Sequence, residues 1–370
     1  MPKVKLGEVA REYKSAVKNA ADLPNVGLEH LIPGEIELTQ WSEDSDNTFT
    51  KGFKKGQMLF GRRRAYLKKA AIAPFDGICS GDITVIEAIP EKILTELLPF
   101  VIQNDRLFDY AVEKSAGSLS PRVKWEHLKN YEFELPEIGQ QKELVDLLWA
   151  MTRAKKAYQN LVKQTDELVK SQFIEMFGDP LKNSKGYQLQ KYGDVFDLNA
   201  GGTPSKNHSE YWDNGTISWI GSNMCQDKVI YENDGQYITR EGFEHSSARM
   251  FKPDTVLVAL VGATIGKTAL LKFETTTNQN VLGIRNIRES GYTPEFVFYY
   301  TQMIHDLFLE KGDWFKMASK GMISGFPIPI VELKAQEHFS SCVEQSDKSK
   351  FELTQAIARI DDMIKALMQG

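Results

Sequence analysis

The feature that most constrains the fold is an internal repeat. When residues 53–71 are laid over residues 251–269 at a constant offset of 198, the two segments match without a gap. The identical pairs include Phe53 and Phe251, Lys54 and Lys252, Leu59 and Leu257, Lys69 and Lys267, and Ala71 and Ala269. Later segments match at offsets of 193 to 195, among them Gln141 with Gln336 and residues 166–170 with 361–365. A drifting offset indicates insertions and deletions in surface loops. The 370-residue chain is therefore a tandem duplication of a unit of somewhat under 200 residues.

Each unit has a mixed front and a helical tail. In the second front, short β-type runs such as residues 216–221 and 255–262 alternate with turn signals. One helix is predicted over residues 293–311, where Thr293-Pro294 supplies a favourable start, and its counterpart covers residues 90–114. This pattern predicts an α+β domain in each unit.

Both tails show apolar residues at alternating spacings of three and four, which is typical of a coiled-coil seam. The predicted seam positions are Leu144, Leu147, Met151, Ala154, Tyr158, Leu161, Thr165 and Leu168 in the first tail, and Phe339, Cys342, Ser346, Ser349, Leu353, Ala356, Ile360, Met363 and Leu367 in the second. Each helix would be about 50 Å long. Copies of one unit usually relate by an approximate two-fold axis, so we expect the helices to run antiparallel, with the two fronts at opposite ends of the spacer.

The stretch "LVGATIGKTALL" (260–271) resembles a phosphate-binding loop, but its spacing is wrong. Such a loop has four residues between its first glycine and the Gly-Lys pair. Here three residues separate Gly262 from Gly266, and the repeat places Arg64 and Lys68 at these two positions in the first unit. We therefore interpret the glycines as turn residues between two strands. We predict that this segment contacts phosphates of a macromolecule rather than those of a nucleotide.

A basic cluster stands out against the overall charge. The chain has a net charge of −5, yet residues 51–71 contain no acid. The basic residues of this stretch are Lys51, Lys54, Lys55, Arg62, Arg63, Arg64, Lys68 and Lys69. Such a cluster is either a surface for nucleic-acid phosphates or a solvated basic face.

Composition excludes several other classes. No apolar run is long enough to cross a bilayer, and the N-terminal residues lack the apolar core of a secretory signal. The cysteines Cys79, Cys225 and Cys342 are too far apart for a disulfide framework or a metal-ligand spacing, and the six histidines do not cluster. We expect a cytoplasmic protein without a metal site.

Residues 198–224, "LNAGGTPSKNHSEYWDNGTISWIGSNM", resemble the opening of a target recognition domain of type I restriction-modification specificity (S) subunits. The Gly-Gly-Thr-Pro-Ser run, the Tyr-Trp pair and the Gly-Thr-Ile-x-Trp-Ile run carry the resemblance. The segments "LVGATIGKTAL" and "TTNQNVLGIR" and the helix after "PIPI" continue it. The first unit lacks the Gly-Gly-Thr-Pro-Ser run and keeps only the Leu-Gly-Glu-Val start (6–9), so residue-level transfer to it is unsafe.

The resemblance implies two recognition domains, at residues 1–136 and 181–330, with a central spacer helix at 137–180 and a C-terminal one at 331–370. It further implies a subunit without catalytic activity or cofactor that binds a bipartite, asymmetric double-stranded DNA site, one half per domain. The partners would be two methylation subunits, which bind S-adenosylmethionine and methylate adenine and dock on the helices. Restriction subunits that translocate DNA can join them. A methylation-only or other split methyltransferase or nuclease system is the alternative within this class.

The candidate DNA contacts follow from side-chain chemistry, because arginine can pair bidentately with guanine edges or phosphates. In the first unit they are Arg62, Arg63, Arg64, Tyr66, Lys68, Lys69, Ser118 and Arg122. In the second they are Thr203, Ser205, Lys206, Thr264, Lys267, Ser319 and Lys320. Three successive arginines cannot all point one way, so we expect one or two on DNA. Trp212 and Trp219 are assigned to the core.

Two other classes of function compete with DNA recognition. A nuclease would use Asp313, Glu332 and Lys334, and an NTPase would use Lys267 and Thr268, but the repeat does not preserve the first set. No Asn-Pro-Pro-Tyr-type methyltransferase motif is found. A coiled-coil scaffold that binds only protein would show no affinity for DNA even at low salt.

Overall fold

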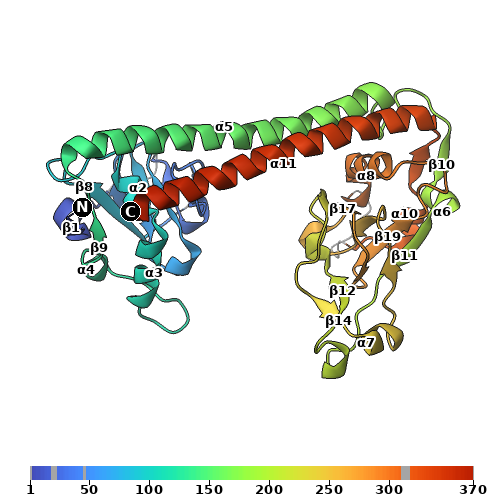
Figure 1. The fold of residues 1–370 in the computed structure, drawn as a ribbon, viewed down its shortest axis with the longest axis horizontal. Coiled ribbons are helices and arrows are strands. Elements are labelled where there is room, and N and C mark those ends of the chain that lie inside the picture. Colours follow the sequence, from blue (N-terminus) through green and yellow to red (C-terminus); the bar gives the residue numbers. More distant parts are fainter. Residues whose placement is uncertain (1, 18–22, 45–46, 310–316, 370) are drawn as a thin grey trace. The chain divides into compact units, whose positions relative to one another are not determined.

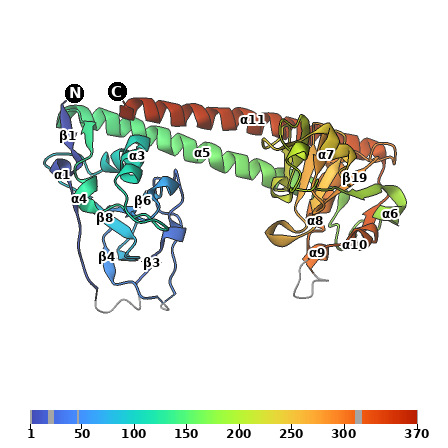
Figure 2. The same ribbon diagram turned by 90° about the horizontal axis from the view of Figure 1, so that it is seen from below.

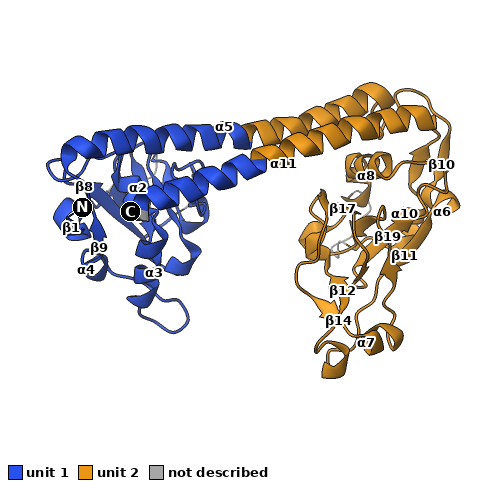
Figure 3. Cartoon of the chain, viewed as in Figure 1, with its two compact units in different colours: residues 1–159, 354–370 blue, residues 160–353 orange. Residues whose placement is uncertain are grey.

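The computed structural model describes residues 2–17, 23–44, 47–309 and 317–369. The chain divides into two compact units (Figure 3). Unit 1 comprises residues 1–159 and 354–370, and unit 2 comprises residues 160–353. Each unit therefore takes part of both long helices, α5 (Ile138–Phe177) and α11 (Leu333–Gln369) (Figure 1).

Unit 1 is built from two small sheets, a two-stranded ribbon and short helices. Its elements are β1 (Lys3–Lys5), α1 (Leu6–Val9), β2 (Ala10–Glu12), β3 (Asn25–Val26), the 3₁₀ turn η1 (Leu28–His30), β4 (Lys51–Phe53), β5 (Met58–Gly61), the 3₁₀ turn η2 (Ala65–Leu67), β6 (Ala70–Ile72), β7 (Gly77–Cys79), β8 (Ile83–Ala88), α2 (Leu98–Ile102), α3 (Asp105–Glu113), α4 (Trp125–Leu128) and β9 (Glu132–Glu134). The strand orders are β2-β8-β5-β6, β3-β7-β4 and β1-β9. Figure 2 shows β3 and β4 at the end of the unit that is remote from α5.

Unit 2 repeats this plan and adds two strands. Its elements are β10 (Leu189–Lys191), α6 (Tyr192–Val195), β11 (Asp197–Ala200), η3 (Ser209–Tyr211), β12 (Ile217–Ile220), η4 (Ser222–Met224), β13 (Lys228–Ile230), β14 (Tyr237–Ile238), α7 (Arg240–Glu244), β15 (Met250–Phe251), β16 (Val256–Ala259), η5 (Gly262–Thr264), β17 (Thr268–Leu271), β18 (Thr275–Thr277), β19 (Val281–Arg285), α8 (Pro294–Met303), α9 (Asp306–Leu309), α10 (Lys320–Ser324) and β20 (Pro327–Pro329). The strand orders are β11-β19-β16-β17-β13, β14-β12-β18-β15 and β10-β20.

The strand starts confirm the repeat. Strands β5, β6, β7 and β8 are separated from β16, β17, β18 and β19 by the same constant offset as the sequence repeat, as the starting pairs Met58 and Val256 or Gly77 and Thr275 illustrate. The pairing is also the same, since β5 lies between β6 and β8 as β16 lies between β17 and β19. The predicted fold, two α+β domains with two long helices, is confirmed.

The helices α5 and α11 run antiparallel, as predicted. In unit 1, Lys155 on α5 pairs with Asp361 on α11 at 2.7 Å. In unit 2, Asp166 on α5 pairs with Lys350 on α11 at 2.9 Å. From the first pair to the second, the position on α5 moves toward the C-terminus while the position on α11 moves back toward the N-terminus by the same amount. At 1.5 Å per residue the helices are about 60 and 55 Å long.

The predicted seam of α5 is half-buried at Leu144, Met151 and Tyr158, but it is wrong by one position at three leucines. Leu147, Leu161 and Leu168 are 45, 44 and 62% exposed, whereas the neighbouring Leu148 and Val169 are buried. Helix α5 has two apolar stripes, and the buried one is interrupted by polar residues such as Lys155, which pairs across the seam. Because of these polar interruptions, the buried stripe cannot be recognised from the hydrophobicity of the sequence alone. On α11, Phe339 is buried as predicted, but Met363 is 51% exposed.

The predicted front helices are also shorter than expected. Thr293 caps α8 by accepting a hydrogen bond from the backbone N–H of Phe296, but α8 ends at Met303 and α9 follows separately. The predicted helix over 90–114 is likewise divided into α2 and α3. Asn104 interrupts it because its extended backbone and its side chain, which accepts from the N–H of Arg106, begin a new helix there.

A buried glutamine fixes the start of each long helix. The amide oxygen of Gln141 accepts from the backbone N–H of Leu94, and that of Gln336 accepts from the N–H of Thr293. Each amide nitrogen donates to the carbonyl five residues earlier, at 2.9 and 3.0 Å. Both side chains are 1% exposed or less. A buried polar group needs such partners, so each glutamine joins its helix to the front of its own unit.

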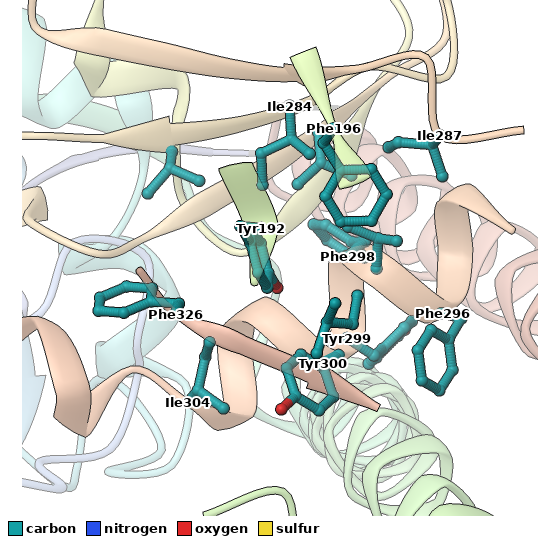
Figure 4. Packing of buried hydrophobic residues seen from close by; sticks show 14 of the residues in the cluster. Tyr192, Phe196, Ile284, Ile287, Phe296, Phe298, Tyr299, Tyr300, Ile304 and Phe326 are labelled. Atoms are coloured by element: carbon teal, nitrogen blue, oxygen red, sulfur yellow. The ribbon is translucent and has the colours of Figure 1, made fainter. Parts of the chain in front are cut away.

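The core of unit 2 is strongly aromatic (Figure 4). Phe173 on α5 lies 5.4 Å from the ring of Phe296 and 5.2 Å from that of Phe339. Tyr192 is also fully buried there, and burial raises the pKa of its phenol. The corresponding cluster of unit 1 is mostly aliphatic and includes Leu148 and, partly buried, Met368.

Candidate nucleic-acid interface

The turn between β5 and β6 carries the three arginines of the basic stretch. Arg64 and Lys68 both adopt left-handed backbone conformations, with φ of 54° and 51°. The equivalent turn of unit 2, between β16 and β17, has Gly262 and Gly266 at the same two positions, with φ of 74° and 75°. The glycines are therefore turn residues, as predicted. A strand, not a helix, follows them, so the turn is not a phosphate-binding loop.

The NTPase residues of the competing hypothesis do not converge on a ligand. Thr268 is fully buried, and its hydroxyl and backbone N–H both donate to the Asp227 carboxylate. Lys267 donates to the side-chain oxygen of Gln226 at 3.1 Å. Thr264 makes only a long 3.5 Å contact with the carbonyl of Val261. The turn thus leaves Thr264 and Lys267 near the surface without forming a nucleotide cradle.

The three arginines have different environments. The Nε of Arg62 is buried without a hydrogen-bond partner. Arg63 donates to the Ser120 hydroxyl at 2.9 and 3.2 Å and reaches Asp82 at 3.4 Å. The Arg64 side chain is exposed, and within the described residues no ion pair is found for it.

Asp82 joins this turn to a second loop. Its carboxylate accepts from Arg122 at 2.6 and 3.2 Å, and the hydrogen bond and charge of Arg122, together with Arg63, hold the pKa of Asp82 below its usual value. Backbone contacts complete the connection, since the N–H of Arg64 donates to the carbonyl of Pro121 at 2.8 Å. Four predicted residues, Arg62, Arg63, Arg64 and Arg122, are therefore brought together.

The remaining candidates of unit 1 divide into paired and free side chains. Lys68 forms an ion pair with Asp105 at 2.6 Å, and Lys69 donates to the backbone carbonyl of Leu28 at 2.6 Å. The Tyr66 side chain is 54% exposed, and Ser118 is exposed. The lysines therefore have structural partners, whereas Tyr66 and Ser118 face outward.

The structure adds one residue that the sequence reasoning missed. Leu119 is 90% exposed at the tip of the hairpin that follows α3, beside Ser118. An apolar residue between serines in a Gly- and Pro-containing turn, "GSLSP", was the available signal. Leu119 has no polar group, so side-chain chemistry alone does not predict it as a DNA contact.

In unit 2, the Gly-Gly-Thr-Pro-Ser loop is packed closely against its neighbours. A Cβ on Gly201 or Gly202 would lie within 2.3 Å of other atoms, so only glycine fits at either position. Trp219 is 6% exposed, and its indole N–H donates to the carbonyl of Gly202 at 3.1 Å. Trp212 packs edge-on against Trp219 at 5.2 Å. Trp219 is therefore buried as predicted, whereas Trp212 is only half-buried and packs beside it.

The other candidates of unit 2 form two separate groups. Thr203 bonds to the side chain of Gln279, and Ser205 accepts weakly from the N–H of Asn207, while Lys206 is exposed. Ser319 caps α10 by accepting from the N–H of Met322, and Lys320 is exposed. The backbone joins the second group to the 262–267 turn, because the N–H of Ala318 donates to the carbonyl of Leu260.

The nuclease interpretation gains no geometric support. Asp313 lies outside the described residues, and Glu332 precedes the first residue of α11. Across residues 2–17, 23–44, 47–309 and 317–369, no group of three or more histidine, cysteine or acidic side chains is arranged to hold a metal ion. Within the same residues, no helix has both the length and the apolar character needed to cross a bilayer.

Comparisons with known proteins all find similarity to type I restriction-modification proteins. The model of the type I restriction modification DNA specificity domain matches residues 184–360. The EcoR124I/EcoR124II specificity subunit of Escherichia coli is 24% identical over 175 residues, which cover 45% of this chain and 42% of that protein. The MjaIX specificity subunit of Methanocaldococcus jannaschii is 34% identical over 121 residues, which cover 32% of this chain and 27% of that protein. The chain thus matches less than half the length of these two relatives.

Solved structures extend the likeness in fold to the whole chain. The type I restriction-modification S subunit from M. genitalium has a TM-score of 0.54 at 12% identity and covers 100% of this chain and 96% of its own. A chain from a structure of type I restriction-modification complex assembly has a TM-score of 0.58 at 18% identity, with 99% and 96% covered. At these identities the likeness concerns the fold alone. Residues 184–360 thus match the type I restriction modification DNA specificity domain, and the whole chain is similar in fold to solved type I restriction-modification S subunits.

Proposed function

We propose that this chain is the DNA-recognition subunit of a type I restriction-modification complex. Each α+β domain binds one half of an asymmetric, bipartite double-stranded DNA site, and α5 and α11 set the distance between the halves. The observation that carries the proposal is the duplicated unit in which equivalent turns hold different side chains. Two similar domains with unlike exposed turns suit a site with two unlike halves.

In this proposal the recognition domains are residues 1–136 and 181–330, and the spacer helices are residues 137–180 and 331–370. The partners are adenine-methylating subunits, two per chain, which supply S-adenosylmethionine chemistry, and restriction subunits that join the complex. The chain itself is non-catalytic. The arginine-rich turn of unit 1 supplies charge for phosphates.

The test is to co-express the chain with the adenine methyltransferase encoded beside its gene, in a host that lacks adenine methylation. Methyl-adenine is then mapped by single-molecule sequencing. The proposal predicts one split motif with two unlike halves and a fixed gap. A complex that forms and binds S-adenosylmethionine, but methylates no defined motif, would contradict the proposal.

A further inference from the structure

We propose that unit 1 reads DNA bases with the tips of two adjoining loops, and that Arg64 and Leu119 make the base contacts. We call this surface the reading tip and define it as Arg64, Tyr66, Leu67, Ser118 and Leu119. The inference rests on the proposed function and deepens it, because it separates residues that contact bases from residues that hold the loops in place.

The two loops are fastened to each other by the backbone. The hairpin closes through reciprocal hydrogen bonds between Ala116 and Arg122 at 3.0 and 2.9 Å. The N–H of Val123 donates to the carbonyl of Arg62 at 3.0 Å, and the N–H of Arg64 donates to that of Pro121 at 2.8 Å. The reading tip is therefore a preorganised surface, which lowers the entropic cost of binding.

The arginines beneath the tip are occupied. Arg63 and Arg122 both contact the Asp82 carboxylate, and Arg63 also donates to the Ser120 hydroxyl. A guanidinium that gives its hydrogen bonds to a protein carboxylate has fewer donors left for a base edge. We therefore assign Arg63 and Arg122 as positioning residues, which leaves Arg64 as the arginine available for bidentate recognition.

The backbone of Arg64 supports a functional role. A side chain other than glycine, asparagine or aspartate rarely adopts the left-handed conformation, because its Cβ approaches the following carbonyl. Unit 2 meets the same turn geometry with Gly262, whose φ is 74°. Unit 1 instead holds an exposed arginine at φ 54°, without an ion pair among the described residues to offset the strain. Strain of this kind is concentrated at functional sites.

The apolar part of the tip points to DNA as its occupant. Leu119 is 90% exposed, Tyr66 54% and Leu67 41%, and they stand beside a run of arginines and lysines with no acid between residues 51 and 71. The hairpin that carries Leu119 projects beyond the end of α3 in Figure 1. The core of a protein interface is depleted of charge, whereas a DNA groove combines surrounding phosphates with apolar thymine methyl groups and base steps that accept an apolar wedge.

The main experiment maps the methylated motif of Arg64→Gly beside that of the wild-type complex. The half-site read by unit 1 should become degenerate at one or more positions, and the affinity for the original site should fall about 10- to 100-fold. The other half-site should remain unchanged. Glycine favours this backbone geometry, so the unfolding midpoint of the chain should stay the same or rise, and misfolding cannot explain the loss.

Leu119→Ser tests the second contact in the same assay. It should relax the sequence selectivity at the same half-site. A base step that accepts Leu119 as a wedge is partly unstacked, so 2-aminopurine placed there becomes more fluorescent when the complex binds. With Leu119→Ser this increase should be smaller. Asn214→Gly in unit 2 is the matched control, because Asn214 also has a positive φ, of 58°, and carries no charge. It should leave the half-site of unit 1 unaltered.

An unchanged motif in both Arg64→Gly and Leu119→Ser would overturn the inference. So would relaxation of the half-site by Asn214→Gly, or an equal loss in both halves with Arg64→Gly. A wild-type complex without any split motif would instead overturn the proposed function, and this inference with it. The two failures are thereby distinguished.

Discussion

The two units agree in how they hold their long helices and differ in the turns that they expose. Gln141 and Gln336 are buried to the same degree and make the same set of hydrogen bonds to their own units. The equivalent turns, in contrast, present Arg64 in one unit and Gly262 in the other. The buried framework of the duplication is thus the same twice, while the outward turn is free to differ. That division is what the proposed function requires of two domains that share a scaffold and bind unlike half-sites.

The cores offer the strongest test of this comparison. Phe173→Ala should lower the free energy of unfolding of unit 2 by about 4 kcal/mol, because a fully buried ring leaves a cavity among other aromatic rings. Met368, its counterpart in the repeat, is only partly buried in unit 1. Met368→Ala should therefore cost about 1 kcal/mol. Denaturation followed by hydrogen exchange of peptides from each unit measures both, and equal losses would show that the cores are not organised differently.

The shared glutamines should behave alike. Gln141→Ala and Gln336→Ala each leave a buried backbone N–H and carbonyl without partners, which should cost about 3 kcal/mol in either unit. The measurement is the denaturation midpoint of each variant. A difference of more than about 1 kcal/mol between the two would mean that the matching hydrogen bonds do not carry matching roles. Gln140→Ala, at an exposed neighbouring position, serves as the control.

Each unit contains a carboxylate paired with basic side chains, so the pH dependence of stability can be compared between the units. In unit 1, the hydrogen bond from Arg122 lowers the pKa of Asp82. In unit 2, burial raises the pKa of Asp254, but hydrogen bonds from Lys272 and Arg288 outweigh it and leave the pKa below its usual value. A carboxyl with a lowered pKa in the folded state stabilises the protein above its unfolded pKa of about 4, and this contribution is lost as the pH falls through the folded value.

Asp82→Asn and Asp254→Asn should therefore each destabilise their unit by about 1–2 kcal/mol at pH 7. The gap between wild type and variant should narrow as the pH falls below about 4. Unfolding at pH 7 and pH 3 checks this expectation. A gap that is the same at both values would show that the negative charge is not what holds the neighbouring cations.

The sequence predicted those features that depend on repetition and on local chemistry. The repeat predicted the equivalent strands, because buried strands tolerate few insertions and so keep a constant spacing. The presence of Arg64 at the position equivalent to Gly262 correctly argued against a nucleotide-binding loop. The seam of α5 could be predicted only in part, because Leu147 and Leu161 form as good an apolar pattern as the stripe that is actually buried. Pairing across the chain decides between them. The ion pairs of Asp82 with Arg63 and Arg122 could not be predicted either, because the two arginines are distant in the sequence and come together only in the folded chain.

The smallest expected effects concern the two turns themselves. Arg64→Gly should raise the free energy of unfolding by up to about 1 kcal/mol, since the relief of left-handed strain outweighs the opposing gain in freedom of the unfolded chain. Gly262→Ala should lower it by about 1 kcal/mol, because a Cβ there has open space around it and only the backbone is strained. Gly266→Ala should cost more, since its Cβ would lie 2.6 Å from the ring of His305. Precise denaturation midpoints separate the three. If Arg64→Gly destabilised unit 1, the Arg64 side chain would stabilise the turn. Arg64 would then belong to the structural framework and not to the reading tip, and the proposed division between the two would be wrong.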